Sequence, residues 1–268
     1  RPRGARAASG GGRPRLTDGH TPSHRVGASP TPPFAKWFAG GQTNLCHNAV
    51  DRHLKDRADQ NALIFVSTET DTEKAYSFRE LHAEVQRMAA IYQSLGVKKG
   101  DRVLIYMPMI AEACFAMLAC VRIGAIHSVV FGGFASHSLA SRIDDAQPTV
   151  IVSADAGMRG GKSVPYKHLL DEAINLSTHK PAKVLMVNRG LAEFARTEGR
   201  DVDYAELRAQ NMDTVVPCEW VDSTHPSYIL YTSGTTGKPK GVQRDTAGYT
   251  VALAASMKHI YMGNPGET

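Results

Sequence analysis

Hydrophobic and polar positions follow two alternating periods from about residue 76 onward. SFRELHAEVQRMAAIYQSLGV is apolar at helical spacing, with a Ser77–Glu80 capping box at its start and Gly96 at its end. Strand-length apolar runs follow at 103–107, 126–131, 149–155, 183–187 and 228–231. Helical patterns separate them at 109–125, 136–146, where Ser136 is the expected cap, 166–176 and 204–210. This alternation predicts an α/β fold with right-handed crossovers and a largely parallel sheet covered by helices on both faces.

Residues 1–33 lack this periodicity and are rich in Gly, Pro, Arg and Ser, which predicts a disordered basic tail. Six arginines and one acid there account for the whole formal net charge of +5. The neutral remainder offers no charge excess for nucleic acid, so we expect no nucleic-acid partner. Arginine-rich, acid-poor composition is also typical of a transit peptide. We therefore expect a cytoplasmic protein, or a mitochondrial one if this segment is a transit peptide.

The rest of the composition indicates a soluble globular protein, with 42% hydrophobic and 21% charged residues. The four cysteines form no CxxC pair and the histidines form no HxH or HExxH motif, so we expect reduced thiols and no protein metal site. Pro108, Glu112 and Arg122 interrupt the most apolar stretch, residues 103–134, which excludes a membrane span there.

The last predicted strand runs directly into a glycine-rich polar loop, YILYTSGTTGKPKGVQRD. Its glycines, at 234, 237 and 241, allow sharp turns and close approach to a ligand, and its hydroxyls and lysines suit a polyphosphate. A Walker A motif fails here, because Thr232 replaces the first glycine and Pro239 replaces the Ser or Thr that binds magnesium. A P-loop kinase or GTPase is therefore disfavoured, and an ordinary flexible loop is the structural alternative.

A second basic segment reads DAGMRGGKSVP. Arg159 and Lys162 flank two glycines, and Ser163 with Pro165 is expected to open the following helix, which would place positive charge at a helix N-terminus and form an anion site. A solvent-exposed basic turn would look similar. FGGFA, residues 131–135, is a strand-to-helix turn whose glycines are expected to serve packing, with a role beside a ligand as the alternative.

YTSGTTGKPKG resembles the phosphate-binding signature of the adenylate-forming (AMP-binding) superfamily. Three longer blocks, beginning at Thr43, Gly100 and His225, resemble its short-chain acyl-CoA synthetase branch, and VQRDTAGY most resembles propionyl-CoA synthetases. The resemblance covers approximately residues 33–268. It implies a reaction in which a carboxylate and ATP give an acyl-adenylate and pyrophosphate, after which the CoA thiolate takes the acyl group and AMP leaves. The implied ligands are ATP with its Mg²⁺, CoA and a small carboxylate.

The resemblance also assigns roles to residues. Lys240 is the implied catalytic residue, stabilising charge on the departing pyrophosphate. The implied ATP phosphate-binding residues are Thr232, Ser233, Gly234, Thr235, Thr236, Gly237 and Lys238. The implied CoA-binding residues are Arg159, Gly160, Gly161 and Lys162. Lys162 stands where acetyl-CoA synthetases commonly carry arginine, which keeps the charge and loses the bidentate geometry.

By the same resemblance, residues 34–268 are an incomplete N-terminal adenylation domain, and the small C-terminal domain with its catalytic lysine is absent. We expect the 268-residue chain to be inactive alone. Two alternatives stay open: an acetyl-CoA synthetase, and a non-catalytic remnant that binds CoA or polyphosphate. A partial parallel sheet of this kind would expose an edge and apolar surface.

Overall fold

The centre of the protein is a seven-stranded sheet, seen in a computed structural model that describes residues 37–233, 239–264, 266 and 267. The strands, in their spatial order, are β10 (Asp201–Asp203), β9 (Lys183–Val187), β6 (Val150–Ala154), β4 (Arg102–Met107), β5 (Ile126–Phe131), β12 (Pro226–Thr232) and β13 (Lys240–Asp245). The first six run parallel to their neighbours, and β13 is antiparallel to β12. The expected α/β fold with a largely parallel sheet is confirmed.

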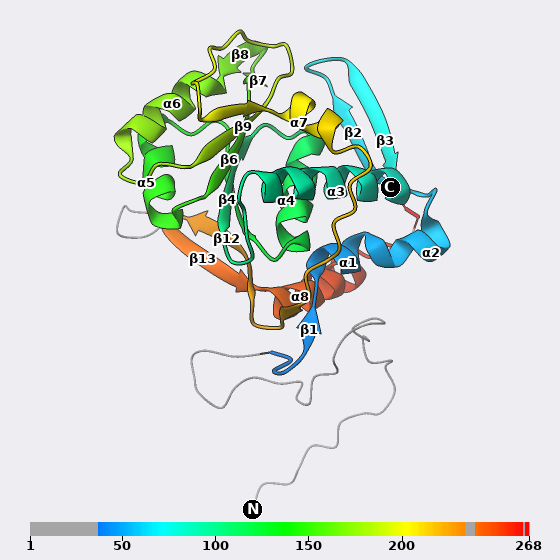
Figure 1. Cartoon of the computed structure of the whole chain (residues 1–268). Helices are drawn as coiled ribbons and strands as arrows, with labels where there is room; N and C mark the ends of the chain where they lie inside the picture. Colours follow the sequence, from blue (N-terminus) through cyan, green and yellow to red (C-terminus); the bar gives the residue numbers. More distant parts are fainter. Residues whose placement is uncertain (1–36, 234–238, 265, 268) are drawn as a thin grey trace, which may run out of the picture.

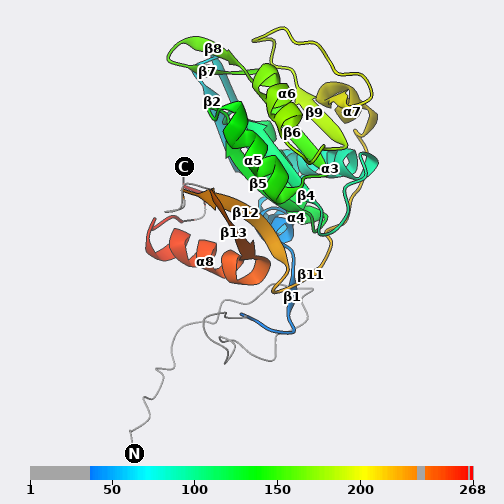
Figure 2. The same cartoon turned by 90° about the vertical axis from the view of Figure 1, so that its left-hand side faces the viewer.

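Helices cover both faces of this sheet (Figures 1 and 2). One face carries α3 (Phe78–Ser94) and α4 (Ala111–Arg122), and the other carries α5 (Ser136–Ala146) and α6 (Tyr166–Leu176). Successive side chains of β4 therefore enter two different cores. Val103 and Ile105 pack in the core beside α3 and α4, whereas Leu104 and Tyr106 pack in the core beside α5 and α6. Burial on both faces explains why this strand is a continuous apolar run.

The sequence located most of these elements closely. The capping box of α3 is present: the Ser77 hydroxyl accepts from the Glu80 backbone N–H at 3.2 Å, and the Glu80 carboxylate accepts from the Ser77 backbone N–H at 2.8 Å. Gly96 follows the helix with φ +88°, as expected of a C-terminal cap. α7 (Tyr204–Gln210) also has the expected bounds.

The start of α5 differs from expectation. Ser136 is the first helical residue and not the cap, which is Ala135 without a capping side chain. The Ser136 hydroxyl instead donates to the Glu172 carboxylate on α6 at 2.6 Å. A contact between two helices has therefore replaced the local cap.

Several short elements did not stand out in the sequence. β2 (Asn61–Ser67) and β3 (Thr72–Ser77) form an antiparallel hairpin, and β7 (Ala156–Arg159) and β8 (Lys162–Pro165) form another. β1 (Gln42–Thr43) pairs with β11 (Val221–Asp222), which fastens the first described segment to the chain just before β12. Three short helical segments follow β1: α1 (Leu45–Ala49), η1 (Asp51–His53) and α2 (Leu54–Arg57).

The end of the sheet that carries β12 and β13 is only partly covered by other elements. α8 (Thr246–His259) lies beside these strands, below α5 and α6 in Figure 2. Large apolar side chains are exposed here on β5, β12 and α8, namely Phe131, Leu230, Leu253 and Met257. None of the described helices combines the length and the apolar character that crossing a membrane requires.

Candidate functional site

The segments with ligand-binding motifs meet at one edge of the sheet. β4, β5, β6, β9 and β12 are parallel, so their carboxyl ends lie at a common edge, where α/β proteins bind ligands. The glycine-rich polar loop follows β12, the FGGFA turn follows β5, and the basic segment follows β6. In the strand order, the polar loop is next to the FGGFA turn and three strand spacings, about 14 Å, from the basic segment.

The glycine-rich polar loop connects the two antiparallel strands β12 and β13. Thr232 at the end of β12 lies opposite Lys240 at the start of β13, so residues 233–239 join the two strands. Thr232, Ser233 and Lys240 are exposed and available to a ligand. The other predicted phosphate-binding residues lie outside the described residues, namely Gly234, Thr235, Thr236, Gly237 and Lys238. The structure thus brings together the two ends of the predicted phosphate site.

The basic segment forms a hairpin. Arg159 in β7 lies opposite Lys162 in β8, and both are exposed at the hairpin tip. Gly160 and Gly161 form the turn with φ values of +57° and +75°. Two consecutive positive φ angles are the requirement of a two-residue type I′ turn, for which glycine has no Cβ penalty.

The expectation that these charges sit at a helix N-terminus is wrong. α6 begins at Tyr166, and its cap is Pro165 without a side-chain hydrogen bond. Ser163 lies inside β8 and donates its hydroxyl to the Leu191 carbonyl at 3.3 Å. Any anion binding by Arg159 and Lys162 would therefore depend on their own charges and on the hairpin backbone.

Tyr166, which the sequence did not single out, connects the FGGFA turn to this hairpin. A Cβ on Gly132 would lie 2.1 Å from the Tyr166 hydroxyl oxygen, and a Cβ on Gly157 would lie 2.3 Å from it. The Tyr166 ring also packs against Tyr106, with ring centroids 5.0 Å apart. Only glycine leaves room for this ring at both positions. For Gly132 this supports the packing role expected of the FGGFA turn.

Asp155 fixes the loop after β9 beside the hairpin. Asp155 is fully buried, and its Oδ2 accepts hydrogen bonds from the backbone N–H groups of Leu191 at 2.7 Å and Ala192 at 3.2 Å. The other carboxylate oxygen has no hydrogen-bond partner within the described ranges. The position of this loop thus depends on one carboxylate that local sequence patterns do not distinguish from a surface acid.

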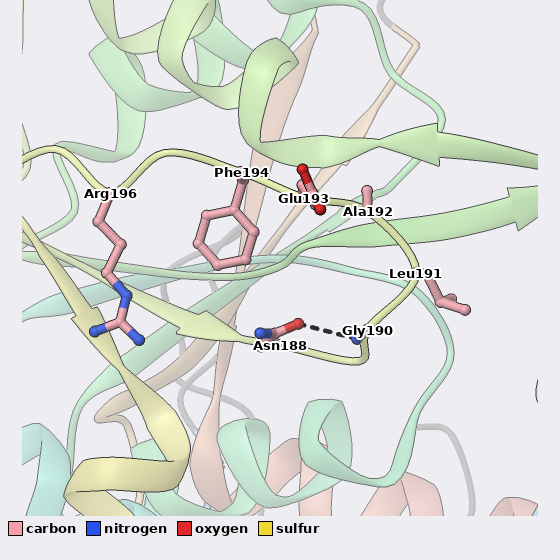
Figure 3. A pocket seen from close by; sticks show the side chains of 7 residues that line it. All are labelled: Asn188, Gly190, Leu191, Ala192, Glu193, Phe194 and Arg196. Carbon is pink, nitrogen blue, oxygen red and sulfur yellow. Dashed lines mark hydrogen bonds between the residues drawn. The ribbon is translucent and has the colours of Figure 1, made fainter.

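The loop after β9 lines a cavity of about 640 Å³ (Figure 3). Its lining residues are Asn188, Gly190, Leu191, Ala192, Glu193, Phe194 and Arg196. The Arg196 guanidinium is already paired with the carboxylates of Asp203 at 2.8 Å and Glu206 at 3.1 Å. Because its cation is neutralised and Glu193 adds a negative charge, the cavity is poorly suited to a phosphate. It contains no residue that the sequence assigned to the site.

A separate cluster brings together three side chains that could bind a metal, Cys46, Asp51 and Cys218, with ligand atoms within 4.8 Å of one another. Arg122 occupies this cluster: its guanidinium donates to the Asp51 carboxylate at 2.9 and 3.0 Å and lies 3.4 Å from the Cys46 sulfur. Although burial opposes it, hydrogen bonds from His82 and Arg122 bring the pKa of Asp51 well below its usual range. Arginine thus supplies the positive charge there, which favours a structural role.

Comparison with known proteins decides the family. The model of the AMP-binding enzyme family matches residues 50–267. The chain belongs to this family. A second model, the acetyl-coenzyme A synthetase N-terminus, matches residues 15–49, so the similarity begins before residue 33, where the sequence motifs placed its start.

Relatives of this AMP-binding chain include acyl-CoA ligases. It is 60% identical to a propionate–CoA ligase of Escherichia coli (strain K12) over 252 residues, which are 94% of this chain and 40% of that protein. It is 63% identical to the propionate–CoA ligase of Salmonella typhimurium over 88% of this chain and 37% of that protein. An acetyl-coenzyme A synthetase of Methylobacterium radiotolerans is 51% identical over 85% of this chain and 35% of that protein. The chain thus spans about two fifths or less of these relatives.

A solved structure shares the fold. The acetoacetyl-CoA synthetase of Streptomyces lividans superposes with a TM-score of 0.83 at 30% identity, covering 92% of this chain and 37% of that one. The AMP-binding chain therefore has the architecture of a corresponding part of a larger acyl-CoA synthetase.

Proposed function

We propose that residues 34–268 form part of the adenylation domain of an ATP-dependent short-chain acyl-CoA synthetase that acts on propionate. The reaction converts propionate, ATP and CoA into propionyl-CoA, AMP and pyrophosphate. The observation that carries the proposal is the YTSGTTGKPKG loop between β12 and β13, at the carboxyl edge of the sheet in a member of the AMP-binding family. Propionate is favoured over acetate because the two relatives named propionate–CoA ligases are 60% and 63% identical, against 51% for the acetyl-coenzyme A synthetase.

The first proposed step is adenylation. A propionate oxygen attacks the α-phosphorus of ATP, which enters with its Mg²⁺ as a substrate, and pyrophosphate leaves. Negative charge grows on the leaving group, so hydroxyl, backbone N–H and lysine donors lower the barrier if they face it. We assign this role to Lys240 and to Thr232, Ser233, Gly234, Thr235, Thr236, Gly237 and Lys238. The exposure of Thr232 and Lys240 at the two ends of the loop supports the assignment.

The second proposed step is thioester formation. The CoA thiolate attacks the acyl carbon of propionyl-adenylate and AMP leaves. We assign the phosphates of CoA to the hairpin tip, where Arg159 and Lys162 lie opposite each other across Gly160 and Gly161. Two exposed cations at one end of a hairpin suit a phosphorylated nucleotide, and the strands that lead to the hairpin and to the phosphate loop, β6 and β12, are three strand spacings apart in the sheet.

The adenylation step is tested by carboxylate-dependent exchange of labelled pyrophosphate into ATP. The protein encoded by the whole gene is assayed with propionate, acetate and butyrate, and the highest kcat/KM is expected with propionate. A higher value with acetate would assign the enzyme to acetate. Absence of exchange with all three, together with measurable CoA binding, would favour the non-catalytic binding module.

Lys240→Ala tests the leaving-group role. Removing one charge-assisted donor is expected to slow exchange by about 100-fold. Lys55→Ala on α2, another exposed lysine away from this edge, is the matched control and should retain the wild-type rate. An unchanged exchange rate in Lys240→Ala would refute the role given to Lys240.

The hairpin is tested by separating the two steps. Arg159→Ala and Lys162→Ala are expected to raise KM for CoA in thioester formation by about tenfold each, since each loses one phosphate contact. Their pyrophosphate exchange should stay at the wild-type rate because adenylation does not use CoA. Equal loss in both assays would contradict a CoA-specific role.

A further inference from the structure

Arg142 on α5 is a buried cation near the ligand edge. The residue is 6% exposed, and its guanidinium donates to the Ser138 carbonyl oxygen at 2.6 Å and to the Ser138 hydroxyl at 2.7 Å. No carboxylate of the described residues lies within 4.0 Å of its nitrogens. A buried charge without a counter-ion is costly, and burial lowers the pKa of this guanidinium. The cost of burying this charge therefore calls for an explanation in terms of its surroundings.

The guanidinium lies between two segments of the candidate site. Its central carbon is 4.5 Å from the ring centroid of Phe134, in the turn after β5, and 5.3 Å from that of Tyr231, one residue before Thr232. Long helical side chains point back toward the helix N-terminus, which explains how Arg142 reaches the turn that precedes α5. Cation–π attraction favours both contacts.

The same helix contacts both ends of the phosphate loop. The Tyr231 hydroxyl donates to the Asp145 carboxylate at 2.5 Å, and Tyr231 lies opposite Gly241 across the hairpin. A Cβ on Gly241 would lie 3.2 Å from the Tyr231 ring and 3.3 Å from the Asp145 carboxylate oxygen. The end of β12 and the start of β13, which flank the loop, thus pack against α5 close to Arg142.

We propose that Arg142 is a positioning residue for ATP: it holds the base of the phosphate loop through Tyr231 and Phe134, and its unpaired charge favours an anionic phosphate chain at this edge. The inference rests on the proposed function, which supplies the anion. A charge in a partly desolvated position is weakly screened, so it attracts an anion without touching it. The buried cation then costs stability in the free protein and contributes affinity in the ATP complex.

Arg142→Met separates this role from a merely structural one. The substitution keeps the length of the side chain and removes the charge, so KM for ATP in pyrophosphate exchange is expected to rise about tenfold while KM for propionate stays unchanged. The melting temperature without ATP should change little, because the substitution removes the cost of burying the charge together with the hydrogen bonds to Ser138 and the cation–π contacts. Arg142→Lys keeps the charge and should recover part of the ATP affinity.

Arg102→Met is the matched control. Arg102 donates to the carbonyl oxygens of Ala146 and Gln147 at 2.8 and 3.1 Å, and it begins β4, at the opposite edge of the sheet. Its KM for ATP should equal that of the wild type. If wild-type protein shows no exchange, the proposed function falls and this inference with it. If wild-type protein is active and Arg142→Met keeps the wild-type KM for ATP, only the role of Arg142 is refuted.

Discussion

His127 makes the stability of this fold sensitive to mild acid. It lies in β5, between β4 and β12, and is 9% exposed. Its ring stacks on Tyr228, with centroids 5.6 Å apart, and its Nδ1 has no hydrogen-bond partner within the described part of the chain. Burial disfavours the charged imidazolium and lowers the pKa of His127 from 6.5 to about 4.

The sign and size of the effect follow from proton linkage. Between pH 6.5 and 4 the unfolded chain binds a proton at this histidine that the folded protein does not bind, so stability falls as the pH falls. A pKa of about 4 in the folded protein against 6.5 in the unfolded chain corresponds to about 3 kcal/mol of unfolding free energy, lost in full below pH 4. Between pH 7.5 and pH 5.0 the expected loss is about 2 kcal/mol.

His127→Phe removes the titration and keeps a ring against Tyr228. Urea unfolding of wild type and variant, followed by circular dichroism at pH 7.5 and 5.0, should show the variant losing about 2 kcal/mol less than the wild type. Other acid-sensitive groups act equally in both proteins and cancel in the comparison. His168→Phe, at an exposed position of α6, should lose as much as the wild type. Equal losses in the wild type and His127→Phe would refute a buried neutral imidazole.

Three further substitutions probe the packing of the fold, each measured by urea unfolding at neutral pH. Arg122→Met leaves the Asp51 carboxylate without its arginine partner and should lower the unfolding free energy by about 3 kcal/mol. The pKa of Asp51 is depressed below 3.8 in the folded protein, so the contribution of this ion pair to stability is lost as the pH falls below that value. An unchanged stability would contradict the pairing. Gly132→Ala places a Cβ against the Tyr166 hydroxyl and should cost about 1–3 kcal/mol, so a neutral result would mean that the ring moves freely. Ser77→Ala removes the helix cap of α3 and should cost about 1 kcal/mol, and no change would show that the cap contributes nothing.

Local periodicity predicted the elements whose burial is uniform, and it failed where a distant contact decides the structure. β4 and α3 were recognisable because every residue of β4 is apolar after Arg102 and because α3 buries one stripe. β2 also contains an apolar run, Ala62 to Val66, but it pairs only with β3 and lies outside the main alternation of strands and helices, so that alternation did not reveal it. α6 begins at Tyr166 as the periodicity indicated, but the charges expected at its N-terminus lie at a hairpin tip, because two glycines with positive φ close a tight turn between Arg159 and Lys162.

The sequence predicted the motifs of the candidate site but not their arrangement in space. The residues that hold its segments in place are far from them in sequence: Asp145 contacts Tyr231 across 86 residues, and Asp155 contacts Leu191 across 36. Neither carboxylate stands out locally from a solvated acid. Only the parallel strand order, which places the ends of β5, β6 and β12 at one edge, brings these residues together.

The packing also changes what the motif glycines signify. Gly132 and Gly157 are required by the Tyr166 ring, Gly241 is tightly packed against Tyr231, and Gly160 closes the hairpin turn. None of these positions needs a ligand to explain its glycine. ATP and CoA binding are therefore supported by the exposed side chains that packing does not explain, which among the described residues are Thr232, Ser233 and Lys240 of the phosphate loop and Arg159 and Lys162 of the hairpin. Substitutions at those side chains test the function, whereas substitutions at these glycines test mainly the fold.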